Sequence, residues 1–548
     1  MAWSVFYKSS LPNPILNGKT IQKVSDRKMI PSLLNITIEQ VSQGLDDGTF
    51  TVTDLVRGYI RRIEEVNDIL HAVIQINPSA ESAAVSLDKE LKRYGRRGPL
   101  HGVPILLKDN IVSLEGFSAT SGSYLLLGTR SPRESPVVIR LKKAGAVILG
   151  SANLSEWTNF RTGSPNWGWS PRGGQTYGAY FDMMGPSGSS SGSAVATDVG
   201  LCVVAIGTET RGSLISPAEV NNVVAIKPTV GLVSGDSLIP VSSRQDTVGP
   251  MARCVKDAAL ILQVITGKEG DDTTTAESSL PDYVTSCRPL ERGSLRLGVS
   301  RYGFESLLPV VQRSFDEVVK SLIERGIDVV DIEYEGTDLY RSLTFEQHLC
   351  TMITEFRESI TSYLIGLTEN PNGLRSLEDL IKATKEDPRE GAPAKDVKMW
   401  QLALKSNPNS KEYKEGRQRG EYFGGLGGIG GAMGKYRLDA IISPAGAKIS
   451  NHFAAAGGLP SLSVPLGFMP DDTPVVWAEN KDMIIQAPNR PYGINVVGKA
   501  YSEEILIKVA LEIEGITRCR ERARHHILPS VDLVDIIRER EMRFKDGS

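Results

Sequence analysis

Apolar residues recur with two alternating periods along the chain. Over residues 55–63 they stand three or four positions apart, which predicts an amphipathic helix. Short apolar runs at 72–76, 105–107 and 146–149 are bounded by Asn, Gly or Pro and predict buried strands. A helical pattern over 135–144 separates the last two runs. This strand–helix–strand order is typical of parallel strands in an α/β fold.

Local start signals place the first helices. The sequence Thr37-Ile38-Glu39-Gln40 has the form of a capping box, so we expect a helix to begin there. Thr53 is expected to cap the helix that follows.

The second half of the chain continues the alternation. Residues 336–420 are mainly helical and polar in pattern, whereas strands and helices alternate on either side of them. The expected elements are strands at 295–299, 327–332, 438–443, 458–468 and 491–498, and helices at 309–326 and 503–513. No repeat and no Pro/Ser-rich linker divides the chain. We therefore expect one α/β domain over residues 1–548, with a mainly helical insertion at about 336–430.

Composition and charge exclude several classes of function. The chain has 548 residues, 40% of them hydrophobic, and its net charge is −3, from 62 basic and 65 acidic residues. This near balance argues against a nucleic-acid or membrane-surface partner. No window approaches 18 uninterrupted apolar residues, so no transmembrane span is expected.

Cysteine and histidine are too dispersed to form a motif. The five cysteines are widely spaced, without a CxxC, which argues against a disulfide framework or a zinc site and fits a reducing, cytoplasmic location. Residues 1–14 lack the pattern of a signal peptide. The six histidines show no ligand spacing. We therefore expect no metal, and a hydrolase of this sequence would also lack a Ser-His-Asp triad.

The segment 185–213, GPSGSSSGSAVATDVGLCVVAIGTETRGS, carries the strongest chemical signal. Ser189 and Ser213 each follow a glycine, in turns whose backbone is unusually free. A hydroxyl in such a turn, beside free backbone N–H groups, suits nucleophilic acyl transfer. A flexible Gly/Ser linker would not run directly into the buried apolar sequence of 195–206.

Lys108 follows directly on the apolar run 105–107. Its side chain could extend to solvent or pair with Asp109. It could equally be a desolvated amine whose neutral form acts as a base. The residues alone support both interpretations.

Two further segments invite a functional interpretation. Residues 157–169 contain three tryptophans and Phe160, which could pack in the core or form an aromatic wall of a substrate cleft. The glycine-rich segment 424–434 has spacing like that of GxGxxG, but no strand precedes it, so we expect no dinucleotide and no cofactor.

Three separated blocks resemble the amidase signature family of serine hydrolases. They are GPLHGVPILLKDN at 98–110, GPSGSSSGSAVA at 185–196 and GTETRGS at 207–213, with a signature core of about 98–262. Their variants are most similar to fungal amidases and peptide amidases. The resemblance implies an α/β amidase signature fold, in which a large mixed, mostly parallel β-sheet is flanked by helices on both faces.

The resemblance also implies a Ser–Ser–Lys triad. Ser213 would be the acyl-forming nucleophile, Ser189 the bridging residue in a cis peptide linkage, and Lys108 the base. The serines stand 213 − 189 = 24 positions apart, as in family members. The backbone N–H groups of Thr210, Arg211, Gly212 and Ser213 would bind the oxyanion, and Ser189 would also contact substrate.

One departure from the family pattern bears on activity. Arg211 stands where Asp or Gly is usual, and its guanidinium could bind an anionic substrate, pair with an internal acidic side chain or point into solvent. We expect hydrolysis of a small-molecule carboxylic amide. The alternatives are a glutaminase-type subunit of an amidotransferase, an acyl transferase, and a protein catalytically altered by Arg211. The sequence leaves a homodimer open.

Overall fold

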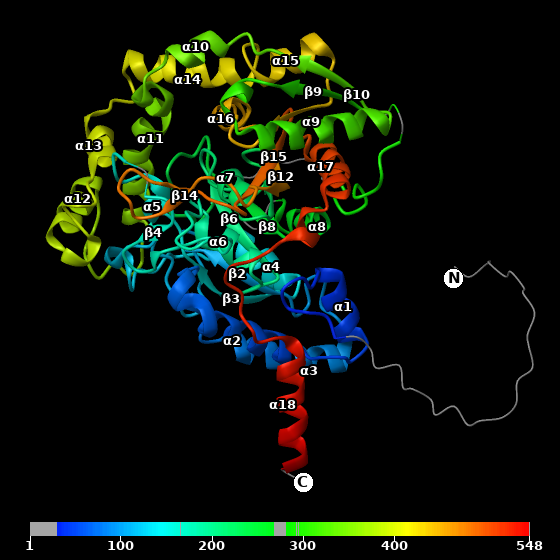
Figure 1. The fold of residues 1–548 in the computed structure, drawn as a ribbon. Coiled ribbons are helices and arrows are strands. Elements are labelled where there is room, and N and C mark those ends of the chain that lie inside the picture. The colour runs from blue at the N-terminus through cyan, green and yellow to red at the C-terminus, as the bar shows by residue number, and fades with distance from the viewer. Residues whose placement is uncertain (1–29, 165, 268–280, 292, 294, 547–548) are drawn as a thin grey trace, which may run out of the picture.

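The computed structural model describes residues 30–164, 166–267, 281–291, 293 and 295–546 (Figure 1). The segment expected to lack a signal-peptide pattern, residues 1–14, lies outside these described residues. None of the described helices is long and apolar enough to cross a membrane.

An 11-stranded mixed sheet forms the centre of the molecule, in the order β1-β3-β2-β6-β8-β7-β12-β15-β11-β9-β10. Its strands are β1 (Val73–Ile76), β2 (Pro104–Lys108), β3 (Val147–Ala152), β6 (Val204–Glu209), β7 (Val224–Lys227), β8 (Thr247–Ala252), β9 (Arg296–Ser300), β10 (Asp328–Ile332), β11 (Ala440–Pro444), β12 (Ser461–Phe468) and β15 (Pro491–Val497). Two short pairs lie outside it, β4 (Trp169–Ser170) with β5 (Gly174–Gln175) and β13 (Val476–Trp477) with β14 (Ile484–Gln486).

The mixed α/β sheet is confirmed, but the expectation of mostly parallel strands needs correction. Among the described residues, four of its ten strand pairings are parallel and six are antiparallel. Parallel pairing is confined to β3-β2-β6 and to β11-β9-β10, where helices connect the strands. The centre of the sheet, from β6 through β8, β7, β12 and β15 to β11, is antiparallel throughout.

Helices cover both faces of the sheet, as expected. Ala225 packs in one cluster with α6 (Ser191–Asp198) and α7 (Ile215–Val220). The flanking Val224 and Ile226 belong instead to the cluster with α8 (Val255–Ile265) and α17 (Glu503–Thr517). Since successive side chains of a strand point to opposite faces, these two helix pairs lie on opposite sides. Other helices outside the insertion are α1 (Ile38–Asp46), α2 (Val52–Leu70), α3 (Ala80–Tyr94), α4 (Pro136–Lys143), α5 (Glu156–Asn159), α9 (Pro309–Glu324), α16 (Ile449–Ala456) and α18 (Leu533–Asp546).

Capping explains where the first two helices begin. Thr37 and Gln40 form the predicted capping box of α1. The cap expected at Thr53 is wrong by two residues: the N-cap of α2 is Thr51, whose side chain accepts from the backbone N–H of Asp54. The hydroxyl of Thr53 donates instead to Asp88, at 2.6 Å.

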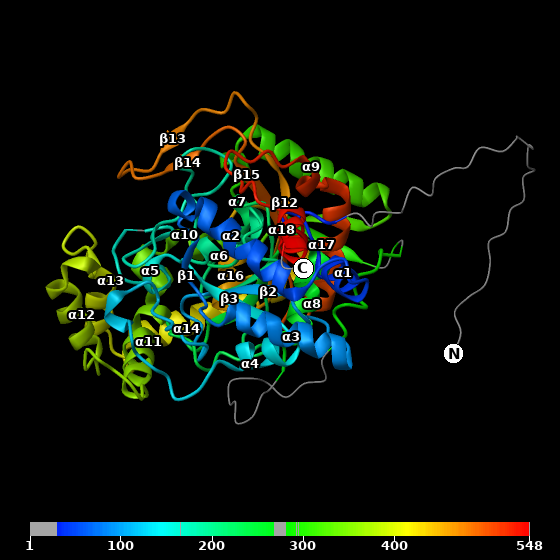
Figure 2. The ribbon, with the colours of Figure 1, turned by 90° about the horizontal axis from the view of Figure 1, so that it is seen from below.

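Helices make up most of the segment predicted as an insertion. They are α10 (Thr337–Ser342), α11 (Phe345–Ile365), α12 (Leu377–Glu386), α13 (Lys398–Lys405), α14 (Lys411–Gly424) and α15 (Ile429–Tyr436). Helices α11, α12 and α13 gather on one side of the molecule, away from α1 and α8, in both views (Figures 1 and 2). Helix α14 contacts α16, which joins the insertion to the rest of the fold. The assignment of a single domain stays a prediction.

Candidate active site

Lys108 ends β2 and is fully buried. Its Nζ donates a hydrogen bond to Ser189 Oγ at 2.8 Å and another to the backbone oxygen of Thr208 at 3.0 Å. Thr208 lies on β6, which pairs with β2. The sheet therefore fixes both the position and the direction of the amine.

Burial sets the charge state of this lysine. Desolvation lowers the pKa of Lys108 to about 7, although the nearby carboxylates of Glu209 and Asp246 act in the opposite direction. A substantial fraction of the amine is therefore neutral near neutral pH. Of the two interpretations that the sequence left open, the structure matches the desolvated amine.

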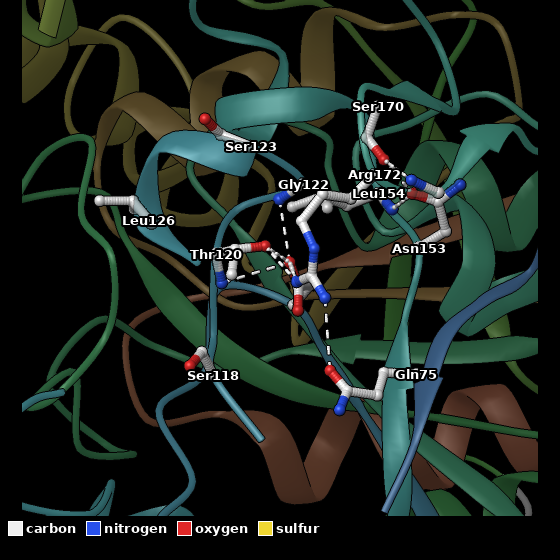
Figure 3. A network of polar contacts seen from close by, with 12 residues as sticks. Gln75, Ser118, Thr120, Gly122, Ser123, Leu126, Asn153, Leu154, Ser170 and Arg172 are labelled. Atoms are coloured by element: carbon white, nitrogen blue, oxygen red, sulfur yellow. Dashed lines mark hydrogen bonds and ion pairs between the residues drawn. The ribbon is translucent and has the colours of Figure 1, made fainter. Parts of the chain in front are cut away.

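Asp109 does not pair with Lys108, because a separate network holds its side chain. Its carboxylate accepts from the hydroxyl of Thr120 and from the backbone N–H of Gly122, at 2.5 and 2.9 Å. Arg172 donates to Thr120 at 2.7 Å and to Gln75 at 3.3 Å, so it lies between them (Figure 3). This network anchors the end of β2 and leaves Lys108 directed toward Ser189.

Ser189 lies in the turn that precedes α6. The bond between Gly188 and Ser189 is cis, as the resemblance implies. The backbone oxygen of Ser189 accepts from Ser155, and the backbone N–H of Ser190 donates to the carbonyl oxygen of Ser213 at 3.0 Å. The backbone thus brings the two predicted serines together from opposite ends of the 185–213 segment.

The loop between β6 and α7 has free backbone donors. The carboxylate of Glu209 accepts from the N–H groups of Leu214 and Ile215, at 2.8 and 3.1 Å, and so fixes the end of the loop. Within the described chain, the N–H groups of Arg211, Gly212 and Ser213 donate to no protein acceptor. Gly212 has φ +83°, a left-handed conformation that favours glycine. Such donors can bind a developing oxyanion.

Ser213 borders a cavity of about 510 Å³. Its hydroxyl has no hydrogen-bond partner among the described residues, so no hydrogen bond joins it to the hydroxyl of Ser189, which contacts Lys108. The charged residues that line the cavity are Arg211, Glu219, Lys448 and Arg490. Its apolar lining includes Phe160, Trp167, Leu307, Leu308, Val311, Phe345, Leu349, Met352 and Met399.

The aromatic segment 157–169 divides between core and cavity. Trp157 is buried and makes an edge-on contact with Trp400 of α13, so it belongs to the core. Phe160 and Trp167 border the cavity. Both interpretations of this segment therefore hold, each for different residues.

Arg211 extends away from Ser213 toward α16. Its Nη2 lies 2.9 Å from His452 Nδ1, which also lies 2.6 Å from the hydroxyl of Tyr340. Within the described chain no carboxylate pairs with Arg211, so the internal salt bridge considered from the sequence is absent. Its role toward substrate stays a prediction.

Sequence reasoning did not single out several residues around the predicted site. Glu209 lies inside the GTETRGS block and Asp246 inside the signature core of about 98–262, and their carboxyl groups are a signal that could have indicated them. Asp246 accepts from the hydroxyl of Thr210 and from two backbone N–H groups at residues 241 and 242. His452 and Tyr340 lie far from the motifs in sequence, and no spacing indicated them.

Comparisons with known proteins identify the family of this chain. The family model named Amidase matches residues 54–507. A protein of Arthroderma benhamiae, named as an amidase, is 37% identical over 540 residues, covering 93% of this chain and 90% of that protein. One of the subunits of the glutamyl-tRNA(Gln) amidotransferase of Streptomyces avermitilis is 27% identical, covering 88% of this chain and 95% of that protein.

A solved structure supports the same relationship. The peptide amidase of Stenotrophomonas maltophilia has a TM-score of 0.78 and 34% identity, covering 90% of this chain and 98% of that one. The expected fold class and the expectation of an amidohydrolase are confirmed at this level. With a family match over most of its length and a mixed sheet that carries the three signature blocks, the chain belongs to the amidase family.

Proposed function

We propose that this protein hydrolyses the C–N bond of a linear carboxylic amide through an acyl-enzyme on Ser213. The observation that carries the proposal is the 2.8 Å contact between the buried amine of Lys108 and the hydroxyl of Ser189. This contact lies directly behind the loop that presents Ser213 to the cavity. A base, a relay hydroxyl and a nucleophile are the parts that serine-based acyl transfer requires.

In the first half of the reaction protons are transferred from Ser213 to Ser189 and from Ser189 to Lys108. One N–H of neutral Lys108 donates to the oxygen of Thr208, which leaves the nitrogen lone pair for the proton of Ser189. Ser189 Oγ in turn takes the proton of Ser213 Oγ as this oxygen attacks the carbonyl carbon. Substrate binding brings the two hydroxyls into hydrogen-bond reach, which is common for catalytic contacts that are loose without substrate.

In the second half a proton returns from Lys108 through the two serines to the departing nitrogen. The free N–H groups of Arg211 and Gly212 bind the oxyanion of the tetrahedral intermediate. Its C–N bond breaks as the relay returns the proton to the departing nitrogen, and Ser213 retains the acyl group. Water then attacks the ester through the same relay, releases the acid and restores both hydroxyls.

The cavity supports substrates with an apolar acyl part. Its walls carry leucine, methionine and aromatic side chains, and burial of each apolar group there stabilises the complex by the hydrophobic effect. The likeness to a peptide amidase favours linear amides for the same site. The amidotransferase relatives keep a glutaminase-type activity as the alternative.

The test is to measure ammonia and acid release from a library of linear amides, with esters and carbamates alongside. We expect turnover of apolar linear amides by the wild-type chain and none by Ser213→Ala. Hydroxylamine in the same assay should trap the acyl-enzyme as a hydroxamate, and release of acid when hydroxylamine is omitted distinguishes hydrolysis from transfer to another acceptor. Activity on glutamine alone, together with a stable hetero-complex in gel filtration, would favour the glutaminase.

A further inference from the structure

A second cavity of about 420 Å³ lies behind the catalytic one and will be called the basic chamber. Most of its lining residues belong to α10, α11, α14 and α16. Arg211 and His452 line both cavities. The chamber therefore adjoins the cavity of Ser213 at this pair of side chains.

Positive charge dominates the lining of the chamber. Four arginines face it, whereas the acidic lining is confined, among the described residues, to Glu421. The side chain of Glu421 is 71% exposed and pairs with Arg417 at 3.6 Å. Arg244 is likewise compensated, by Glu355 at 3.0 Å. The other two arginines are Arg211 and Arg419.

These two guanidinium groups lack adequate counterions. In the described chain Arg211 has no carboxylate partner, and the one carboxylate near Arg419 is that of Glu415, 3.9 Å away. The Nε of Arg419 is buried without a hydrogen-bond partner, and only 17% of its side chain is exposed. Leaving charged donors partly buried and unpaired is costly, so a ligand that supplies acceptors would be stabilised here.

The histidines of the chamber add to this imbalance. Because Arg211 donates to His452 Nδ1, that nitrogen must be unprotonated. Burial lowers the pKa of His452 and His348, and the charge of Arg211 lowers both further. Neutral histidines can donate or accept hydrogen bonds, but they do not compensate the arginines.

We propose that the basic chamber binds a small oxyanion, a carboxylate or a phosphate group, through Arg211 and Arg419. Guanidinium groups bind both kinds of anion through paired N–H donors. The oxyanion is either an acidic group carried by the amide substrate or a free anion. If the substrate carries it, the inference rests on the proposed function; binding of a free anion does not depend on that function.

Binding is tested on the full-length protein by calorimetric titration with inorganic phosphate and with glutarate. We expect both probes to bind, and Arg419→Gln to weaken binding by about tenfold or more through loss of a charged donor. Thr351→Glu, which introduces a carboxylate at the chamber wall, should have the same effect. Arg357→Gln is the matched control, because Arg357 lies on α11 but pairs with Glu378 outside the chamber.

The source of the anion is tested by comparing adipamic acid with hexanamide as substrates. If the wild-type protein has a higher kcat/KM for adipamic acid than for hexanamide, and Arg419→Gln removes this difference, the chamber binds the acidic group of the substrate. If Arg419→Gln lowers kcat/KM equally for both amides, the chamber binds a free anion. Anion binding that depends on Arg419, with no hydrolysis of any amide, would contradict the proposed function and not the chamber. Absence of binding of both probes up to about 20 mM, or binding that neither Arg419→Gln nor Thr351→Glu changes, would overturn the inference.

Discussion

The amine of Lys108 lies 2.8 Å from the hydroxyl of Ser189 in a fully buried position, although 81 residues separate the two in the chain. Two adjacent structures create this contact, the end of β2 and the turn before α6. Because the lysine is both desolvated and hydrogen-bonded, it is suited to act as a base at neutral pH.

Replacement of this lysine tests its role as the base. We expect Lys108→Met to reduce kcat by about three orders of magnitude or more, because it removes the proton acceptor and keeps an apolar stem of similar length. Circular dichroism should show an intact fold. The matched control is Lys256→Met, which removes an exposed lysine paired with Glu39 and should leave kcat near the wild-type value. Wild-type kcat in Lys108→Met would exclude the lysine as the base.

The lowered pKa of Lys108 predicts how kcat/KM depends on pH. Below its pKa of about 7 Lys108 is protonated and cannot accept a proton, so kcat/KM should rise with pH and level off above that value. The measurement is kcat/KM for one neutral amide across a range of about pH 5 to 9, which brackets that pKa. A profile that is flat across this range would contradict the assignment.

The charge of Asp246 should affect the pH dependence of kcat/KM. Its negative charge raises the pKa of Lys108, so Asp246→Asn is expected to move the rising limb of the pH profile to lower pH. The amide keeps an acceptor for the hydroxyl of Thr210, but its NH2 group replaces the oxygen that accepts from the backbone N–H groups of residues 241 and 242, so circular dichroism must show an intact fold. Asp471→Asn, at an exposed pair with Arg524, is the control. A limb that stays in place, or moves to higher pH, would show that the charge of Asp246 does not act on Lys108.

Gly212 provides a test of the oxyanion loop. Its φ of +83° is strained for alanine, and an added Cβ would lie 3.1 Å from Ser216 Oγ. We expect Gly212→Ala to lower kcat by about tenfold or more with little change in KM, since the N–H groups would shift from the oxyanion. Gly235→Ala, where the added Cβ meets open space, is a suitable comparison. Unchanged kcat in Gly212→Ala would argue against an oxyanion site at this loop.

A buried ion cluster should hold the insertion in place. Arg161 is fully buried and donates to Glu156 at 2.5 Å and to the backbone oxygens of Glu390, Lys395 and Asp396. The carboxylate of Glu390 also lies 3.6 Å from the same guanidinium. We expect Arg161→Met to destabilise the protein by about 3–5 kcal/mol, because the buried carboxylates of Glu156 and Glu390 lose their cation. Hydrogen exchange should increase most in residues 388–405. Exchange that rises uniformly over the chain would show that the cluster does not anchor the insertion.

The features that could be predicted from the sequence are those encoded by local patterns or by short motifs. The buried strand before Lys108, the capping box at Thr37 and the glycine turns at Ser189 and Ser213 follow from short-range patterns. The antiparallel centre of the sheet does not, because it joins strands from distant parts of the chain, as where Ser461 of β12 lies opposite Lys227 of β7. The same holds for His452, which meets Arg211 across 241 residues.

The direct test of the central claim is covalent labelling of the nucleophile. The full-length protein is treated with a fluorophosphonate, and the modified peptide is located by mass spectrometry. The account predicts one adduct on Ser213, absent from Ser213→Ala and greatly slowed in Lys108→Met, with both variants folded. An adduct on another residue, or equal labelling of Ser213→Ala, would contradict it.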